Sequence, residues 1–187
     1  MKEEIISVIE ESIDVKKKLA GIAGHIELAA KIIIDALKHG GRVITFGNGG
    51  SAADAQHIAA ELVGRFQKNR KAFPALALTT NTSILTSISN DYSFDVIFSR
   101  QLEALVDKTD VCIAISTSGN SSNVVEGIKT AKAAGAKIIS LTGENGGSMA
   151  PLSDICINVP SKVTARIQES HIVIGHIICQ LVEKELS

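Results

Sequence analysis

The sequence predicts an α/β protein with a doubly wound, five-stranded parallel sheet. Five short runs rich in Val, Ile, Leu and Ala are apolar almost throughout rather than alternating, as strands covered on both faces are. Helical segments lie between successive runs, and connections of that kind join parallel strands. Loops rich in glycine or serine directly follow two of the runs, at the place where open parallel sheets bind ligands.

Helices precede the first strand. Apolar residues recur at helical spacing over the start of the chain, and a glycine-containing break at residues 21–24 separates a second helix over residues 26–38. The chain shows no low-complexity linker and no sign of a second domain. We therefore expect a single domain over residues 1–187, with residues 1–40 as an N-terminal helical extension and residues 41–187 as the α/β core and C-terminal helix.

The strands and the last helix complete the predicted architecture. Five strands are expected at residues 42–46, 73–78, 111–116, 137–141 and 155–159. The final helix, over residues 164–186, is apolar on nearly every side between His171 and Val182. A helix without a polar face must be surrounded by protein. We therefore expect a homo-oligomer assembled around helices, and the alternative is a helix buried inside a monomer.

Composition narrows the function. The chain has 19 Lys and Arg against 20 Asp and Glu, a formal charge of −1, which argues against broad nucleic-acid binding. Aromatic residues make up only 3% of the chain, so stacking recognition of single strands is not expected. Three cysteines without a CxxC pair indicate neither a disulfide framework nor a thiolate metal site. No signal peptide or membrane-spanning stretch is apparent, so we expect a cytoplasmic protein without membrane contact.

Two loops have the chemistry to bind a phosphate. Residues 47–51 read Gly-Asn-Gly-Gly-Ser, in which the glycines permit close backbone approach and Ser51 is placed to cap the next helix. Residues 116–121 read Ser-Thr-Ser-Gly-Asn-Ser, and their hydroxyls meet a helix N-terminus, whose dipole favours an anion. Because neither loop contains Lys, hydroxyl and amide groups would hold the phosphate.

Each loop also has an alternative interpretation. Residues 47–52 match G-x-G-x-x-A, but a dinucleotide needs an acidic residue at the end of the second strand, and residues 76–80 contain none. A P-loop is excluded because no G-x-x-x-x-G-K-[ST] occurs, and no G-x-S-x-G nucleophile elbow is present. The serine-rich loop taken alone could be an ordinary capped turn.

Polar residues on two helices are candidate metal ligands. His57 and Glu61 are four residues apart, so their side chains lie on one helix face, and Arg65 continues that stripe. Gln168 and His176 are about two turns apart on the last helix. From spacing alone, a surface pair at His57 and Glu61 and a hydrogen-bonded core histidine at His176 remain alternatives to a metal site.

Together these residues resemble the sugar isomerase (SIS) domain family and, within it, the phosphoheptose isomerases. The motifs follow the family's order over nearly the whole chain: GNGGS at 47–51, DAQHIAAE at 54–61, Asn90-Asp91, STSGNS at 116–121, and ARIQE at 165–169 with His176. The resemblance implies a flavodoxin-like fold. It also implies aldose–ketose isomerisation of sedoheptulose 7-phosphate to D-glycero-D-manno-heptose 7-phosphate through a cis-enediol, the first step of nucleotide-activated heptose biosynthesis.

The resemblance further implies roles for particular residues. The phosphate would be held by Ser116, Thr117, Ser118 and Ser121. The sugar would be lined by Asn48, Gly49, Gly50, Ser51, Glu61, Arg65, Asn90, Asp91 and Gln168. Glu61 and His176 correspond to the acid and base, and the zinc ligands of some members correspond to His57, Glu61, Gln168 and His176. A homotetramer with active sites shared between subunits is implied as well.

One position departs from some family members, because an Asp three residues before the Gln of the last helix is Ala165 here. No role of that Asp is therefore expected. Two other functions remain open. A non-catalytic SIS adaptor that associates with the replication initiator is disfavoured by Ser118 and His176, whereas an isomerase of another phosphosugar would differ in pocket depth. The sequence also leaves open whether Glu61 or His176 is the base.

Overall fold

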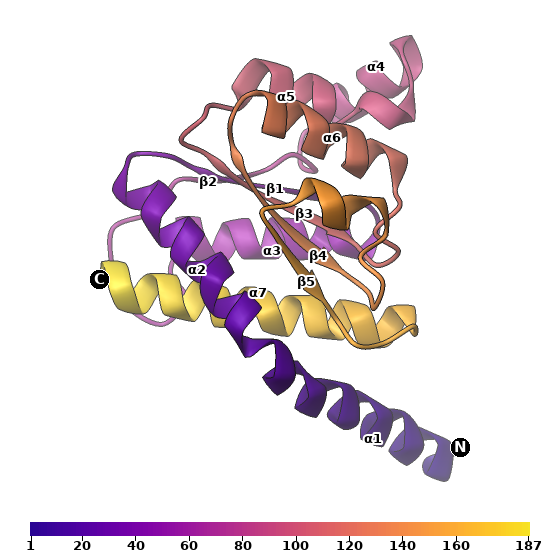
Figure 1. Ribbon diagram of the computed structural model, residues 1–187. Helices are drawn as coiled ribbons and strands as arrows, with labels where there is room; N and C mark the ends of the chain where they lie inside the picture. Colours follow the sequence, from indigo (N-terminus) through magenta and orange to yellow (C-terminus); the bar gives the residue numbers. More distant parts are fainter.

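The computed structural model describes all 187 residues and contains a five-stranded sheet in which all neighbouring strands are parallel (Figure 1). The strands are β1 (Val43–Gly47), β2 (Ala75–Ala77), β3 (Val111–Ser116), β4 (Lys137–Thr142) and β5 (Ile155–Asn158). Their order across the sheet is β2-β1-β3-β4-β5. The expected doubly wound parallel sheet of five strands is confirmed.

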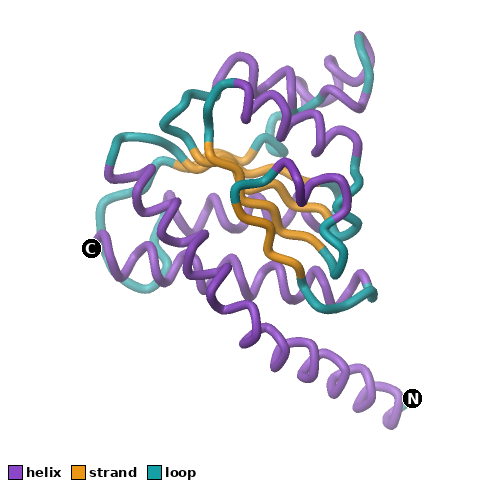
Figure 2. The backbone as a smooth tube through the Cα atoms, in the orientation of Figure 1, coloured by secondary structure: helices purple, strands orange, loops and turns teal.

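Helices cover both faces of the sheet. They are α1 (Lys2–Lys18), α2 (Ala23–Lys38), α3 (Gly50–Val63), α4 (Thr82–Asp91), α5 (Ser99–Leu105), α6 (Ser122–Ala133) and α7 (Thr164–Leu186), with 3₁₀ segments η1 (Leu19–Ile22), η2 (Phe94–Val96) and η3 (Gly147–Leu152). Figures 1 and 2 show α2, α3 and α7 on one face and α5 and α6 on the other. Val43 packs into the core on the side of α2, α3 and α7, and Ile44 packs into the core on the side of α5 and α6. Because both faces are buried, the strands are apolar throughout.

The main departures from the expected elements lie between strands. The segment joining β4 to β5 forms only the 3₁₀ turn η3, because its glycines and Pro151 disfavour an α-helix. β2 covers three residues, fewer than expected, and Pro74 before it has no N–H to extend the ladder. Between β2 and β3 the chain forms α4, η2 and α5, which the sequence patterns did not locate.

The first two helices lie differently with respect to the sheet. Ile26, Ala29 and Ile33 of α2 are buried against the sheet and α7. In contrast, α1 projects from the body of the molecule (Figure 1). It carries an exposed row of isoleucines, here called the α1 stripe, whose members are 45% to 57% exposed: Ile5, Ile6, Ile9 and Ile13.

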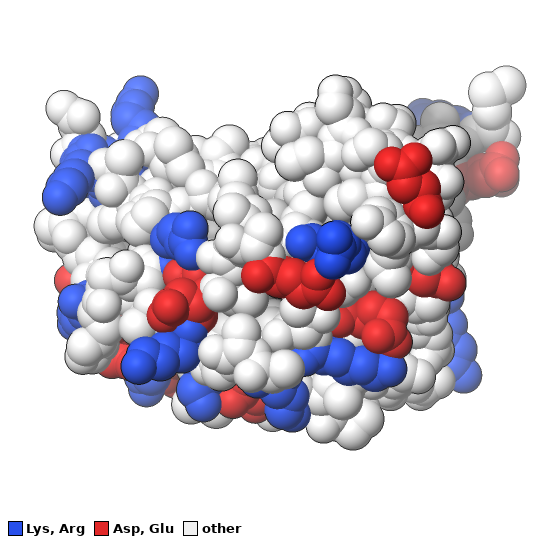
Figure 3. All heavy atoms as spheres, turned by 90° about the horizontal axis from the view of Figure 1, so that it is seen from above, with Lys and Arg blue, Asp and Glu red and all other residues white.

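The surface reflects the balanced composition. On the face seen in Figure 3, basic and acidic side chains are interspersed and form no single-sign patch. Many charged side chains of the protein are paired, as in the ion pair of Arg100 with Glu103 at 2.6 Å. None of the helices combines the length and hydropathy that a membrane span requires.

Candidate functional site

The strand order places a topological switch point between β1 and β3. From β1 the chain continues through α3 on one face of the sheet, and from β3 through α6 on the other. Ligands of open α/β sheets bind in the crevice at such a point. Here Asn48 and Asn123 bridge the two connections with reciprocal amide hydrogen bonds of 2.8 and 2.9 Å. The two loops that the sequence singled out therefore lie side by side.

The first loop needs glycine for its backbone. Gly49 has a φ of +55°, in the left-handed region, and a Cβ at Gly50 would overlap the side-chain amide of Gln168. Ser51 is buried in the first turn of α3, where Gly49 is the N-cap and no side chain caps the helix. The expectation that Ser51 caps this helix is wrong, because the flexible glycine pair starts the helix before Ser51 is reached.

Hydroxyl groups of the second loop face one another. Ser116 Oγ lies 2.9 Å from Ser121 Oγ and 3.3 Å from Ser118 Oγ. Ser121 occupies the N-cap position of α6, but no side chain bonds the first N–H groups of this helix. Helix N-termini with unpaired N–H groups attract anions. The loop therefore presents hydroxyl and amide donors together, beside the half-buried Thr117.

The serine-rich loop is braced from behind. Gly119 has a φ of +67°, and a Cβ there would overlap the carbonyl of Gly146. Asn120 Oδ1 accepts hydrogen bonds from the N–H and the hydroxyl of Ser148, both at 2.9 Å. The carbonyl of Thr117 accepts the N–H of Gly143 at 3.0 Å. These contacts fix the loop to the segment that follows β4.

His57, Glu61 and His176 meet between α3 and α7 and are here called the histidine cluster. His57 Nε2 lies 3.0 Å from Glu61 Oε1 and 3.3 Å from His176 Nε2, and the three ligand atoms lie within 4.8 Å of one another. A neutral His57 Nε2 carries either a proton or a lone pair, so it satisfies only one of its neighbours. A divalent cation would satisfy all three atoms. Two imidazoles and a carboxylate are ligands that catalytic zinc accepts.

Gln168 does not join the histidine cluster within one chain. Its side chain lies against Gly50 at the start of α3. His176 is eight residues further along α7, a separation of about 12 Å at ~1.5 Å per residue. The chain by itself therefore brings three of the four candidate ligands together.

Other candidates lie apart from both groups. Arg65 is exposed just beyond the end of α3. Asn90 and Asp91 are exposed at the end of α4, and Asn90 Nδ2 donates to Asp91 Oδ1 at 2.9 Å. Neither residue bonds to the loops at the switch point. Within one chain, these three side chains therefore lie away from both the switch-point loops and the histidine cluster.

Two polar residues at the site, Asp54 and Asn123, were not predicted from the sequence to have a role. Asp54 lies one turn before His57, and one of its carboxylate oxygens is buried without a hydrogen-bond partner. Burial raises the pKa of Asp54 to about 6, partly offset by His57. Asn123 is buried and holds Asn48. Asp54 begins the DAQHIAAE motif at 54–61, which was the available signal for it, whereas nothing local distinguishes Asn123.

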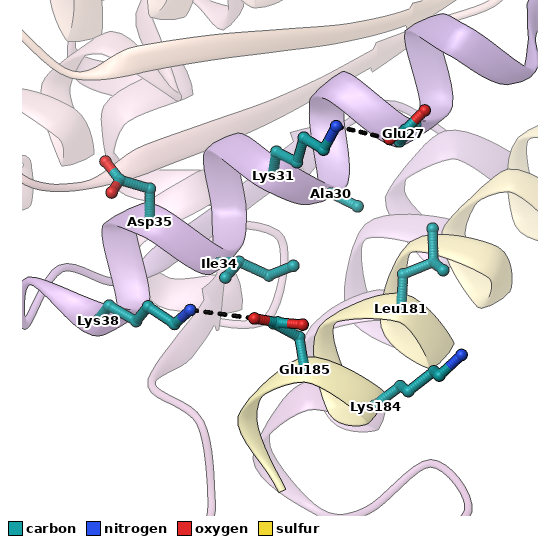
Figure 4. A pocket seen from close by; sticks show the side chains of 9 residues that line it. All are labelled: Glu27, Ala30, Lys31, Ile34, Asp35, Lys38, Leu181, Lys184 and Glu185. Carbon is teal, nitrogen blue, oxygen red and sulfur yellow. Dashed lines mark hydrogen bonds and ion pairs between the residues drawn. The ribbon is translucent and has the colours of Figure 1, made fainter.

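The cavities described here do not connect the loops at the switch point with the histidine cluster. A cavity of about 150 Å³ at the switch point is lined by the first loop and by Leu85, Phe94 and Phe98. A larger cavity of about 610 Å³ lies between α2 and α7 and contains none of the candidate residues (Figure 4). Its Lys38 is already paired with Glu185 at 3.2 Å. Neither cavity joins the serine-rich loop to the histidine cluster.

Comparison with known proteins gives a consistent result. The SIS domain family matches residues 9–143 of this chain. The phosphoheptose isomerase of Aquifex aeolicus is 54% identical over 185 residues, which cover 98% of this chain and 97% of that protein. A phosphoheptose isomerase structure from Neisseria gonorrhoeae matches with a TM-score of 0.93 at 43% identity over 98% of each chain. One from Francisella tularensis matches with a TM-score of 0.94 at 36% identity over 97% of each chain.

Proposed function

This chain belongs to the phosphoheptose isomerase family of SIS-domain proteins, and we propose that it converts sedoheptulose 7-phosphate to D-glycero-D-manno-heptose 7-phosphate. It is an isomerase, because the reaction moves a carbonyl between adjacent carbons without a second substrate. The product would enter nucleotide-activated heptose biosynthesis. The observation that carries the proposal is 54% identity to an enzyme of this name over 98% of the chain.

The serine-rich loop would bind the phosphate. Hydrogen bonds of 2.9 and 3.3 Å hold the hydroxyls of Ser116, Ser121 and Ser118 together. Hydroxyl protons rotate freely, so these groups can turn toward phosphate oxygens without moving the side chains. Thr117 and the N-terminus of α6 add further donors.

The first loop would line the sugar. Gly49 and Gly50 allow the backbone to approach the ligand, with Ser51 behind them. The amide of Asn48 is held by Asn123, which would fix its orientation toward the sugar. Hydroxyl groups further along the sugar would be contacted by Glu61, Arg65, Asn90, Asp91 and Gln168.

We propose zinc at the histidine cluster, with His57, Glu61, His176 and Gln168 as its ligands. The convergence of three ligand atoms within 4.8 Å supports this assignment. When bound, the ion would act as a Lewis acid on the sugar carbonyl. Because Gln168 lies about 12 Å along α7 from His176 in the same chain, its amide would reach the cluster from a neighbouring subunit.

Glu61 and His176 would transfer the protons. A base removes a proton from the carbon beside the carbonyl, which gives a cis-enediol, and returns it to the adjacent carbon. An acid moves a proton between the two oxygens. Carboxylate and imidazole suit these tasks because their pKa values can be tuned toward neutrality. Because their side chains converge within 4.8 Å, both groups would be able to act on one sugar bound beside the cluster.

We also propose that the active form is a cytoplasmic homotetramer in which each chain is a single domain and active sites are shared. The exposed α1 stripe supports the assembly, because rows of isoleucine at 45% to 57% exposure mark an interface. The position of Gln168 supports sharing, since its chain's own histidine cluster is out of its reach.

The proposal is tested by assaying turnover of sedoheptulose 7-phosphate before and after chelation. We expect turnover to be lost on chelation and restored by zinc. If chelation does not change turnover, Glu61 and His176 remain the proposed acid and base, and the proposed role of zinc is wrong. No turnover by a folded oligomer supplied with zinc would contradict the function and favour the adaptor or another phosphosugar.

Substitutions test the residue assignment. Glu61→Gln and His176→Gln should each lower kcat by about 10²-fold or more, the usual contribution of acid–base catalysis, with the oligomer intact by light scattering. His39→Gln is the control, because the His39 side chain is exposed at the end of α2 and its hydrogen-bond and ion-pair partner is Asp35. Near-wild-type rates for both cluster variants would overturn the assignment.

A further inference from the structure

A buried ion pair holds the segment after α3 against α7. The side chains of Arg70 and Glu183 are 4% and 3% exposed, and Arg70 Nε donates to Glu183 Oε1 at 3.0 Å. The same carboxylate accepts the backbone N–H groups of Phe66, Gln67 and Lys68 at 2.8 to 3.0 Å. Burial acts to raise the pKa of Glu183, but these hydrogen bonds outweigh it and hold the pKa below its usual value. The buried charge is therefore fully compensated.

Arg70 connects this pair to the end of α3. Its Nη2 donates to the carbonyl of Glu61 at 2.9 Å, and its Nη1 donates to the carbonyl of Leu62 at 3.0 Å. Carbonyls in the last turn of a helix lack partners within the helix. The guanidinium also lies 4.0 Å from the ring centroid of Phe73. Arg70 thus holds the backbone of the residue that carries the cluster's carboxylate.

Glu183 reaches the other side of the cluster through Phe66. The Phe66 N–H is bound by Glu183 at 3.0 Å, and the Phe66 ring lies 5.6 Å from the His176 ring, centroid to centroid. This separation is within the range of favourable aromatic contacts. Glu183 also lies two turns after His176 on the same face of α7. One ion pair therefore contacts the supports of both Glu61 and His176.

We infer that Arg70 and Glu183 are positioning residues that hold Glu61 and His176 in their reactive arrangement, an inference that rests on the proposed function. Neither residue touches the cluster's side-chain ligand atoms. They act through the last turn of α3 and through Phe66. Catalytic groups must be held within about 0.5 Å of the productive geometry, and a displacement of about 1 Å can cost about 10²-fold in rate.

Glu183→Gln tests the inference, because it keeps the shape of the side chain and removes its charge. We expect kcat to fall about 10-fold or more and the affinity for zinc alone, measured by competition with a chromogenic chelator, to fall about 10-fold. KM should change little, because the phosphate donors lie in the serine-rich loop. Arg70→Lys should act in the same direction, since Lys cannot donate to Glu183, Leu62 and Glu61 from one rigid fork.

Asp110→Asn is the matched control. The Asp110 side chain is 2% exposed and, like Glu183, accepts an arginine (Arg42) and backbone N–H groups, but neither Asp110 nor its partners Arg42 and Asp107 form a hydrogen bond with α3 or α7. It should lose stability while keeping kcat and zinc affinity. Wild-type kcat and zinc affinity in Glu183→Gln, or equal losses in Asp110→Asn, would show that the pair is only structural.

Three further outcomes are decisive. If Glu183→Gln does not fold, Phe66→Leu removes the ring beside His176 but keeps the N–H, and an unchanged kcat and zinc affinity there would overturn the inference. If the wild-type protein shows no turnover, the proposed function fails, while the zinc affinities of the variants still test the positioning role. If the wild type turns over substrate without zinc, the kcat of Glu183→Gln compared with those of the wild type and Asp110→Asn tests the positioning role.

Discussion

His171 is a titratable residue that the fold holds neutral. It is completely buried on α7, its Nε2–H donates to the carbonyl of Thr142 at 3.1 Å, and its Nδ1 has no partner. Burial lowers its pKa to about 4, and the hydrogen bond to Thr142 offsets only part of that effect. Because Nε2 is committed to Thr142, His171 is not available to the histidine cluster.

We expect His171 to destabilise the fold as the pH falls from about 6.5 to about 4. In this interval the unfolded chain protonates the ring and the folded chain does not, so the unfolded state binds more protons. The difference between these pKa values corresponds to about 3 kcal/mol in the free energy of unfolding. Denaturant titrations of the wild type and of His171→Gln at several pH values measure it.

The wild type must be compared with His171→Gln because Asp54 changes the pH dependence of stability in the opposite direction. Its pKa is raised to about 6, so its contribution to stability is present at low pH and is lost as the pH rises through that value. His171→Gln retains Asp54 and should lack only the histidine's contribution. Identical pH slopes in the two proteins would contradict the prediction.

At the scale of elements, the approach of α3 to α7 sets the geometry of the histidine cluster. A Cβ at Gly175 would lie 2.8 Å from two side-chain carbons of Ile58. Ile58 follows His57, and Gly175 precedes His176. The absence of a side chain at Gly175 therefore allows the two helices to come together where the two histidines meet.

We expect Gly175→Ala to cost about 1–3 kcal/mol of stability by overpacking. It should also lower kcat, because the helices separate at His57 and His176. Thermal unfolding and steady-state kinetics measure the two effects. The double variant Gly175→Ala with Ile58→Val should recover part of both losses, since Val lacks the Cδ1 carbon. A single variant with wild-type kcat would show that the helix spacing is not limiting.

At the scale of the whole molecule, the α1 stripe has no partner within the chain. We expect Ile9→Glu, at a position 52% exposed, to dissociate the assembly into smaller species and to abolish turnover if sites are shared. Burying the exposed half of each isoleucine of the stripe contributes about 1 kcal/mol to association, and a buried unpaired charge opposes it. Light scattering and activity at matched concentration measure the result.

Glu10→Gln is the control for this variant, because it changes an exposed neighbour on α1 without adding charge to the α1 stripe. It should assemble and turn over like the wild type. An Ile9→Glu protein with wild-type mass and activity would show that α1 does not form the interface.

The sequence by itself determined the features that depend on neighbours along the chain. Continuous apolar runs located all five strands, and the bounds expected for β3 and α7 agree with those observed. Loop composition located the phosphate-binding candidates, and helical spacing paired His57 with Glu61. The helices between β2 and β3 were missed: α4 buries no residue within the chain, and α5 spans only seven residues, too few for a clear helical pattern.

Only the tertiary structure decided which distant residues meet. His57 and His176 are 119 positions apart, and Arg70 and Glu183 are 113 apart. Their contacts depend on how α3 and α7 pack on one face of the sheet, and the bridge between Asn48 and Asn123 depends on the strand order. Local periodicity indicates which side of an element is buried. It does not indicate which element packs against that side, because this depends on how whole helices and strands pack together.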